Sequence, residues 1–138
     1  MKSLYRFFVG GLLCCVAADS PSAAVGITIR NRFNSRRYPD NICEVVRQGR
    51  YWKGHPVKHK CQFSYFCDGK SETISDLRAW QNALDLAAII LSTRLEIAGL
   101  ENVTHYHSVK VKPDWSRKLY YKTTVGRHLF YVKKRSDL

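Results

Sequence analysis

Hydrophobic residues recur at steps of three and four in one stretch of the chain, and this spacing predicts its longest helix, from about Ile74 to Thr93. Thr73 and Asp76 precede the stretch with the spacing of a capping box. A helix with one apolar stripe buries that stripe, so we expect the following residues to face the core: Leu77, Trp80, Leu84, Ala87, Ala88, Leu91 and Leu95.

Two later stretches alternate in the manner of β-strands. "VTHYHSVKV" places His105, His107, Val109 and Val111 on one face and Thr104, Tyr106 and Ser108 on the other, and Pro113 ends it. "VGRHLFYVKK" alternates too and begins at a glycine, as a second strand of the same sheet would. Helices together with a small antiparallel sheet predict an α+β fold.

The first half of the chain is less regular. "AVGITIRNRF" fits either a strand or one buried face of a helix, and periodicity alone does not decide. In "YPDNICEVVRQG", Pro39 breaks the preceding chain, Asn41 can cap, Glu44 stands three residues further on and Gly49 can close the end, which predicts a short helix. The stretch that follows, up to Glu72, is rich in Gly, Pro, aromatic residues and lysine, and we expect a long structured loop there.

The N-terminus has the three parts of a secretory signal peptide. Lys2 and Arg6 precede an apolar run from Phe7 to Ala17, and small residues follow it, so we expect cleavage after Ala24. The alternative is that this segment is a buried helix of the domain. The apolar run is shorter than the roughly 20 residues that span a membrane. We therefore expect an exported protein, periplasmic or extracellular, with residues 25–138 as its single domain and no membrane span after cleavage.

Composition narrows the class of partner. A chain of 138 residues with 45% hydrophobic content buries one core, and we expect a monomer. Its net charge of +12 favours polyanions, either nucleic acid or an anionic cell envelope. The basic residues are spread from Arg30 to Arg135 and form no DNA-reading element, so we expect no specific nucleic-acid partner.

The histidines and cysteines invite comparison with a zinc site. His105 and His107 would point the same way from a strand, with "HPVKH" and "CQFSYFC" as further ligands, but Cys61 and Cys67 stand further apart than a zinc knuckle requires. We expect no metal and no cofactor. In an oxidising compartment the two cysteines can instead form a disulfide, with Cys43 as the competing partner or the leftover thiol. No neighbouring base marks a nucleophilic cysteine.

Five blocks of sequence, in order, resemble the cell wall hydrolases related to the spore cortex-lytic enzyme SleB, over about Val25 to Tyr131. They are "IRNRFNSRRYPDNICEVV", "GHPVKHKCQFSYFCDGK", "AWQNALDLA", "VTHYH" and "VGRHLFY". The resemblance implies a lysozyme-like α+β domain that cleaves peptidoglycan glycan strands as a lytic transglycosylase. Such an enzyme needs a glutamic acid, held protonated, to protonate the glycosidic oxygen, and the sugar's own hydroxyl then attacks in place of water.

The chain departs from this family at the catalytic position. The expected "Glu-Ala-Arg-Gly-Glu"-like segment would fall near Leu13, and no glutamate precedes Glu44. Glu44 is a weak candidate for the acid, because capping already explains its place. Either the chain is a degenerate or truncated homologue, with its first helix replaced by an apolar leader, or a distant acid such as Asp68 or Glu72 substitutes.

The binding side of the cleft is expected to survive in either case. The blocks "QFS" and "THYH" supply residues for sugar hydroxyls and acetamido groups, and Tyr65 or Tyr106 could stack on a sugar face; the alternative for each is support of the core. The resemblance thus implies a peptidoglycan hydrolase, active or inactive, or a non-catalytic peptidoglycan binder. A basic nucleic-acid binder is the competing class. The substrate-binding residues it implies are Gln62, Ser64, Thr104, His105, Tyr106 and His107.

Overall fold

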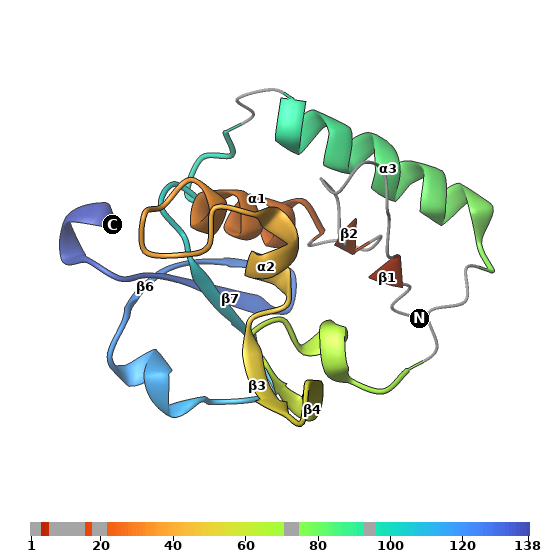
Figure 1. Cartoon of the computed structure of the whole chain (residues 1–138). Helices are drawn as coiled ribbons and strands as arrows, with labels where there is room; N and C mark the ends of the chain where they lie inside the picture. Colours follow the sequence, from red (N-terminus) through yellow and green to blue (C-terminus); the bar gives the residue numbers. More distant parts are fainter. Residues whose placement is uncertain (1–3, 6–15, 18–21, 71–74, 93–95) are drawn as a thin grey trace.

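A computed structural model describes residues 4–5, 16–17, 22–70, 75–92 and 96–138, and it shows an α+β fold (Figure 1). Its helices are α1, α2 and α3, at Ser22–Phe33, Ile42–Val46 and Leu77–Ser92. Single 3₁₀ turns lie at Ser64–Cys67 (η1), Asp114–Arg117 (η2) and Arg135–Asp137 (η3). The strands are β1 Leu4–Tyr5, β2 Val16–Ala17, β3 Gly49–Trp52, β4 His55–Cys61, β5 His105–Ser108, β6 Tyr120–Val125 and β7 His128–Val132.

The last three strands form one antiparallel sheet in the order β5-β7-β6. In β5, Tyr106 lies opposite Phe130 and His107 lies opposite Leu129. The prediction that the two alternating stretches are strands of one sheet is confirmed, although β5 ends at Ser108, before Pro113. Strand β6 was not predicted; it forms a hairpin with β7 through Gly126, whose φ is +57°.

Helix α1 is buried on two sides, which explains why its pattern fits both a helix and a strand. Val25 and Ile29 pack in one core cluster with α2 and Phe63. Ala24 and Ile27 pack in a second cluster with α3 and the sheet. A segment with apolar residues on two faces shows no single period, so only its tertiary contacts decide its conformation.

The region from Val46 to Cys61 differs from the prediction. Helix α2 is confirmed, since the Asn41 side chain accepts a hydrogen bond from the Glu44 N–H at 3.2 Å, but the helix ends at Val46 and Gly49 begins β3. An added Cβ at Gly49 would lie 2.7 Å from Cys61 Cα, so the glycine permits close approach of two strands and does not close a helix. The predicted long loop is wrong up to Cys61, because β3 and β4 form an exposed antiparallel hairpin.

Helix α3 is confirmed, but its buried face is rotated from the predicted stripe. Its buried residues are Ala83, Ala87 and Ile90, while Leu77 is 75% exposed. Small residues permit close packing on α1, where a Cβ at Gly26 would lie 2.6 Å from Ile90 Cδ1. The Asp76 carboxylate accepts a hydrogen bond from Ala79 N–H at 3.0 Å; the predicted cap Thr73 lies outside the described residues.

Most of the predicted signal peptide also lies outside the described residues. Its described parts are β1, β2 and the first residues of α1, and β2 contacts both α1 and α3. None of the helices in the described ranges is long and apolar enough to cross a membrane.

Candidate functional site

Tyr106 of β5 joins the two core clusters and thereby brings two distant segments together. Its ring centroid lies 6.0 Å from that of Phe63 and 5.6 Å from that of Phe130, and it packs against both clusters. Burial raises the pKa of its hydroxyl well above the usual value, so the group stays neutral. Since Phe63 lies between Gln62 and η1, this contact places the "QFS" segment beside the "THYH" segment, with Tyr106 itself in a supporting position.

The opposite face of β5 carries an aromatic cluster made of His105, His107, Trp115 and Tyr131. Trp115, held on η2, lies with its ring centroid 5.3 Å from His105 and 5.6 Å from His107. Tyr131 of the neighbouring strand stacks on His107 at 5.3 Å. Trp115 is partly exposed and therefore offers an aromatic surface beside the histidines. Sequence reasoning missed it, because it follows Pro113 in an irregular segment.

His107 is fully hydrogen-bonded and only 9% exposed. Its Nδ1 lies 2.8 Å from the Ser108 carbonyl oxygen, which can only accept, so Nδ1 carries the proton. In the neutral ring Nε2 is then the acceptor, and the Tyr131 hydroxyl donates to it at 2.9 Å. This arrangement leaves His107 no free nitrogen for a ligand.

His105 is different, because only one of its ring nitrogens is engaged among the described residues. Its Nδ1 lies 2.9 Å from Thr104 Oγ1. Burial and the nearby cations Arg32 and Lys133 lower the pKa of His105 to about 4, so the ring is neutral at pH 7. Its Nε2 is available for a hydrogen bond to a ligand.

Arg32 of α1 fixes the start of β5 from within the protein. It is 2% exposed, and its Nε donates to the Thr104 carbonyl oxygen at 2.6 Å. The guanidinium lies over the rings of Tyr38 and Phe63, at 4.7 and 5.2 Å. Burial lowers the pKa of Arg32 from its usual value. No carboxylate pairs with it in the part of the chain that the structure describes, and sequence reasoning did not single it out.

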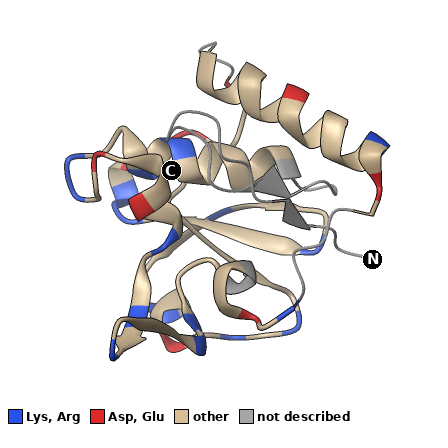
Figure 2. Cartoon of the chain, turned by 45° about the vertical axis from the view of Figure 1, so that its right-hand side comes forward, with Lys and Arg blue, Asp and Glu red and all other residues tan. Residues whose placement is uncertain are grey.

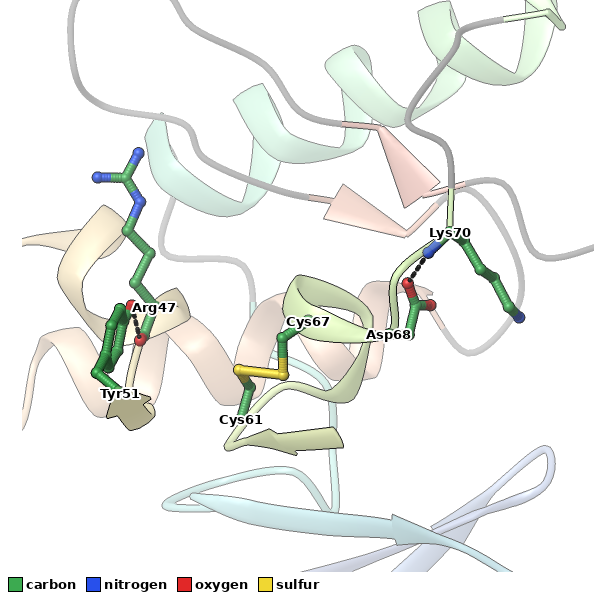
Figure 3. Close-up of a disulfide and its surroundings, with 6 residues drawn as sticks. All are labelled: Arg47, Tyr51, Cys61, Cys67, Asp68 and Lys70. Atoms are coloured by element: carbon green, nitrogen blue, oxygen red, sulfur yellow. Dashed lines mark hydrogen bonds between the residues drawn. A yellow bond between two sulfur atoms is a disulfide. The ribbon is translucent and has the colours of Figure 1, made fainter. Parts of the chain in front are cut away.

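The segment after β4 is closed by a disulfide between Cys61 and Cys67, with Cα atoms 6.1 Å apart (Figure 3). Cys43 is also disulfide-bonded and so is not a leftover thiol. Gln62 is exposed, and its N–H donates to the Gln48 carbonyl oxygen at 2.8 Å. Ser64 begins η1, but its side chain and that of Tyr65 lie outside the described set.

The acidic residues of the described ranges do not provide an enclosed general acid. All carboxylate side chains of the described ranges are exposed or partly exposed, Glu44 among the exposed ones. Asp68 Oδ1 accepts the Lys70 N–H at 2.9 Å in a local turn (Figure 3), and Glu72 lies outside the described residues. Nor do three or more His, Cys, Asp or Glu side chains gather to hold a metal within those ranges.

Residues 19–131 match the sequence profile of a family described as Cell Wall Hydrolase. The match contains every block quoted above, including the two segments that Phe63 and Tyr106 hold together. No curated protein and no solved structure gives a significant match.

Proposed function

The chain belongs to the cell wall hydrolase family, and from this membership we propose that it recognises the glycan strands of peptidoglycan. The observation that carries the proposal is the aromatic surface at β5, where the partly exposed ring of Trp115 lies with its centroid 5.3 Å from that of His105. His105 Nε2 supplies a hydrogen-bonding group for sugar hydroxyls, and the partly exposed Trp115 supplies a ring for the apolar face of a sugar. The exposed Gln62 follows the other face of the strand, next to the Phe63 that contacts Tyr106.

Lytic transglycosylase chemistry is the reaction that this family membership suggests. A carboxylic acid protonates the glycosidic oxygen, the C1–O bond breaks, and the hydroxyl at C6 of the same sugar attacks C1 and loses its proton. The acid must be neutral at the working pH, which requires burial or a like charge nearby.

A non-catalytic peptidoglycan binder is the second candidate, and the exposure of the carboxylates favours it. Glu44 is exposed at the first turn of α2, where its N–H donates to the Asn41 side chain, so no apolar cleft encloses its carboxyl group. Without an enclosed acid the recognition surface remains but cleavage loses its proton donor.

Incubation with purified peptidoglycan distinguishes the two. Release of muropeptides whose terminal sugar is lighter by one water would support transglycosylase activity, and Glu44→Gln would then leave the rate unchanged if Glu44 only caps α2. Co-sedimentation without release supports the binder. Walls that neither retain the protein nor lose material would refute both.

The positive net charge makes a nucleic-acid binder a further hypothesis to test. Figure 2 shows Lys and Arg spread over the hairpin, the loop after α1 and the chain after β7, while α3 carries only Arg78 and Asp85 as charged residues. A nucleic-acid binder would lose affinity steeply with salt and would prefer DNA or RNA to neutral glycan. Binding to chitin-type oligosaccharides at high salt would argue against that class.

Export to the envelope is part of the same proposal. Cleavage after Ala24 would cut within the first turn of α1, where Ala24 is 1% exposed, and would remove β2 from its contacts with α1 and α3. N-terminal sequencing of the protein recovered from the periplasm or medium tests the site. Recovery only from the cytoplasm would contradict export.

A further inference from the structure

The β3–β4 hairpin stands in solvent at the edge of the molecule opposite α3 (Figure 1). Trp52 pairs with His55 across a two-residue turn, in which Lys53 and Gly54 have φ angles of +48° and +80°. Positive φ at both turn positions is the geometry of a type I′ turn, whose twist matches that of the strands and gives the tip a defined shape. A Cβ added at Gly54 would meet no atom within 4 Å, so the tip is free of other contacts.

Two aromatic side chains lie at this tip. Trp52 is 70% exposed and has neither a hydrogen bond nor a ring contact among the described residues. Tyr51 is 44% exposed, and its hydroxyl donates to the Arg47 carbonyl oxygen at 2.8 Å (Figure 3). Its polar end is therefore engaged while its ring remains open to solvent. A surface that removes the Trp52 ring from water would gain the free energy of burying it.

The hairpin and its flanks are basic without a counter-charge. The chain has no Asp or Glu between Glu44 and Asp68. Five basic side chains lie in this interval, all exposed and none in an ion pair among the described residues: Arg47, Arg50, Lys53, Lys58 and Lys60. Elsewhere such a group is paired, as Lys122 is with Glu101 at 3.4 Å. The uncompensated charge, blue on the hairpin in Figure 2, produces a positive potential that attracts an anionic surface.

The order of these groups along the hairpin favours a lipid surface. Trp52 lies next to the turn, whereas Arg50 and Lys60 lie further back along their strands. In a bilayer an indole ring settles at the headgroup level, where its apolar body meets the acyl chains, and lysine and arginine face the anionic headgroups. Lys53, in the turn itself, has an aliphatic chain long enough to return its amine to that level. In a groove of duplex nucleic acid the leading side chains instead meet polar base edges and phosphates.

We propose that the β3–β4 hairpin docks on an anionic lipid surface, with Trp52 inserted at the interface and the surrounding lysines and arginines facing the lipid phosphates. Such docking is peripheral and reversible, because charge attraction and one indole ring act without a lipid anchor. It does not depend on glycan recognition, since Trp52 has no contact with the aromatic cluster of β5.

Co-sedimentation with lipid vesicles tests the docking. Vesicles of phosphatidylcholine mixed with phosphatidylglycerol are expected to bind the protein at least about a hundredfold more tightly than pure phosphatidylcholine, and less tightly as salt is raised. Trp52→Ala should weaken this binding about tenfold, because it removes the inserted ring. The combined variant Arg50→Gln, Lys53→Gln and Lys60→Gln should weaken it about a hundredfold, at roughly fivefold for each charge.

Matched controls lie between β5 and the start of β6. Tyr120 is 42% exposed, and Tyr120→Ala should leave vesicle binding unchanged. A second combined variant removes three exposed charges outside the hairpin and should weaken binding by no more than about threefold, because distant charges are screened. Its changes are Lys110→Gln, Lys112→Gln and Lys118→Gln. Urea denaturation checks that each variant is folded.

Equal binding to both kinds of vesicle, or no binding to the anionic ones at low salt, would overturn the proposal. A loss in the control variants as large as in the hairpin variants would also overturn it. Duplex DNA binding that Trp52→Ala weakens as much as vesicle binding would place a nucleic acid at the tip instead. Sedimentation with purified walls is scored separately: its failure removes the proposed function and leaves the hairpin proposal standing, whereas its loss in Trp52→Ala alone would assign the tip to glycan and overturn the docking.

Discussion

The aromatic cluster around His107 and the polar pocket that Tyr38 lines both adjoin β5 or the residue before it, but they satisfy their polar groups in opposite ways. In the cluster, both ring nitrogens of His107 are bonded and Tyr131 donates to one of them. In the pocket, the Tyr38 hydroxyl is buried with no partner among the described residues. A fully bonded buried network specifies one structure, whereas an unpaired buried donor costs free energy in the folded protein. The contrast separates an aromatic cluster whose hydrogen bonds around His107 are complete from a buried Tyr38 hydroxyl that lacks a partner.

The largest expected effect comes from Arg32→Ala, since Arg32 serves both regions. The change removes the hydrogen bond to the Thr104 carbonyl, the cation over Tyr38 and a buried side chain. We expect the free energy of unfolding to fall by about 3 kcal/mol, as for other large-to-small changes in a core, measured by urea denaturation. Arg36→Ala, on the exposed loop nearby, should change it by less than about 0.5 kcal/mol. Equal effects of the two variants would mean that Arg32 does not hold β5.

Removing one hydroxyl from each region compares them directly. Tyr131→Phe leaves His107 Nε2 unpaired and should lower the free energy of unfolding by about 1–2 kcal/mol. Tyr38→Phe breaks no hydrogen bond in the free protein and should leave the free energy of unfolding unchanged or slightly raised. Denaturation curves of both variants at pH 7 check this. A destabilised Tyr38→Phe would show that the hydroxyl has a partner and that the contrast is wrong.

The smallest effect concerns pH, through His105, which lies between the two regions. Its pKa is about 4 in the folded protein, against the usual histidine value of 6.5 in an unfolded chain. The folded protein therefore binds this proton less tightly than the unfolded chain does. The stability that neutral His105 provides is therefore complete above pH 6.5 and is lost as the pH falls from about 6.5 to about 4. His105→Gln should flatten the pH dependence of the unfolding midpoint in this window. His55→Gln, at an exposed position, should leave it as in the wild type.

The sequence predicted the elements whose signals are local. Asn41 and Glu44 mark the start of α2, and alternation around His105 and Leu129 marks two paired strands; both are confirmed because capping and pleating depend on residues a few positions apart. The order of the "QFS" and "THYH" blocks likewise indicated the family that the profile match shows. The predicted buried face of α3 was right for Ala87 but wrong for Leu77, and it missed Ala83 and Ile90, because Gly26 lets Ile90 approach α1.

The hairpin was missed because its strands are exposed on both faces and therefore show no alternation of apolar and polar residues. In the sequence Gly49 resembles a helix end, and only the folded structure shows that it lies against Cys61. What the sequence determined by itself was the presence of α2, α3, β5 and β7, the family, and a set of candidate residues for recognition. Only the tertiary structure decided that Tyr106 supports the core, that Trp115 covers the histidines, and that Arg32 and Lys133 enclose Tyr38. These relations join residues far apart in the chain, and no short-range pattern encodes which distant side chains share a buried space.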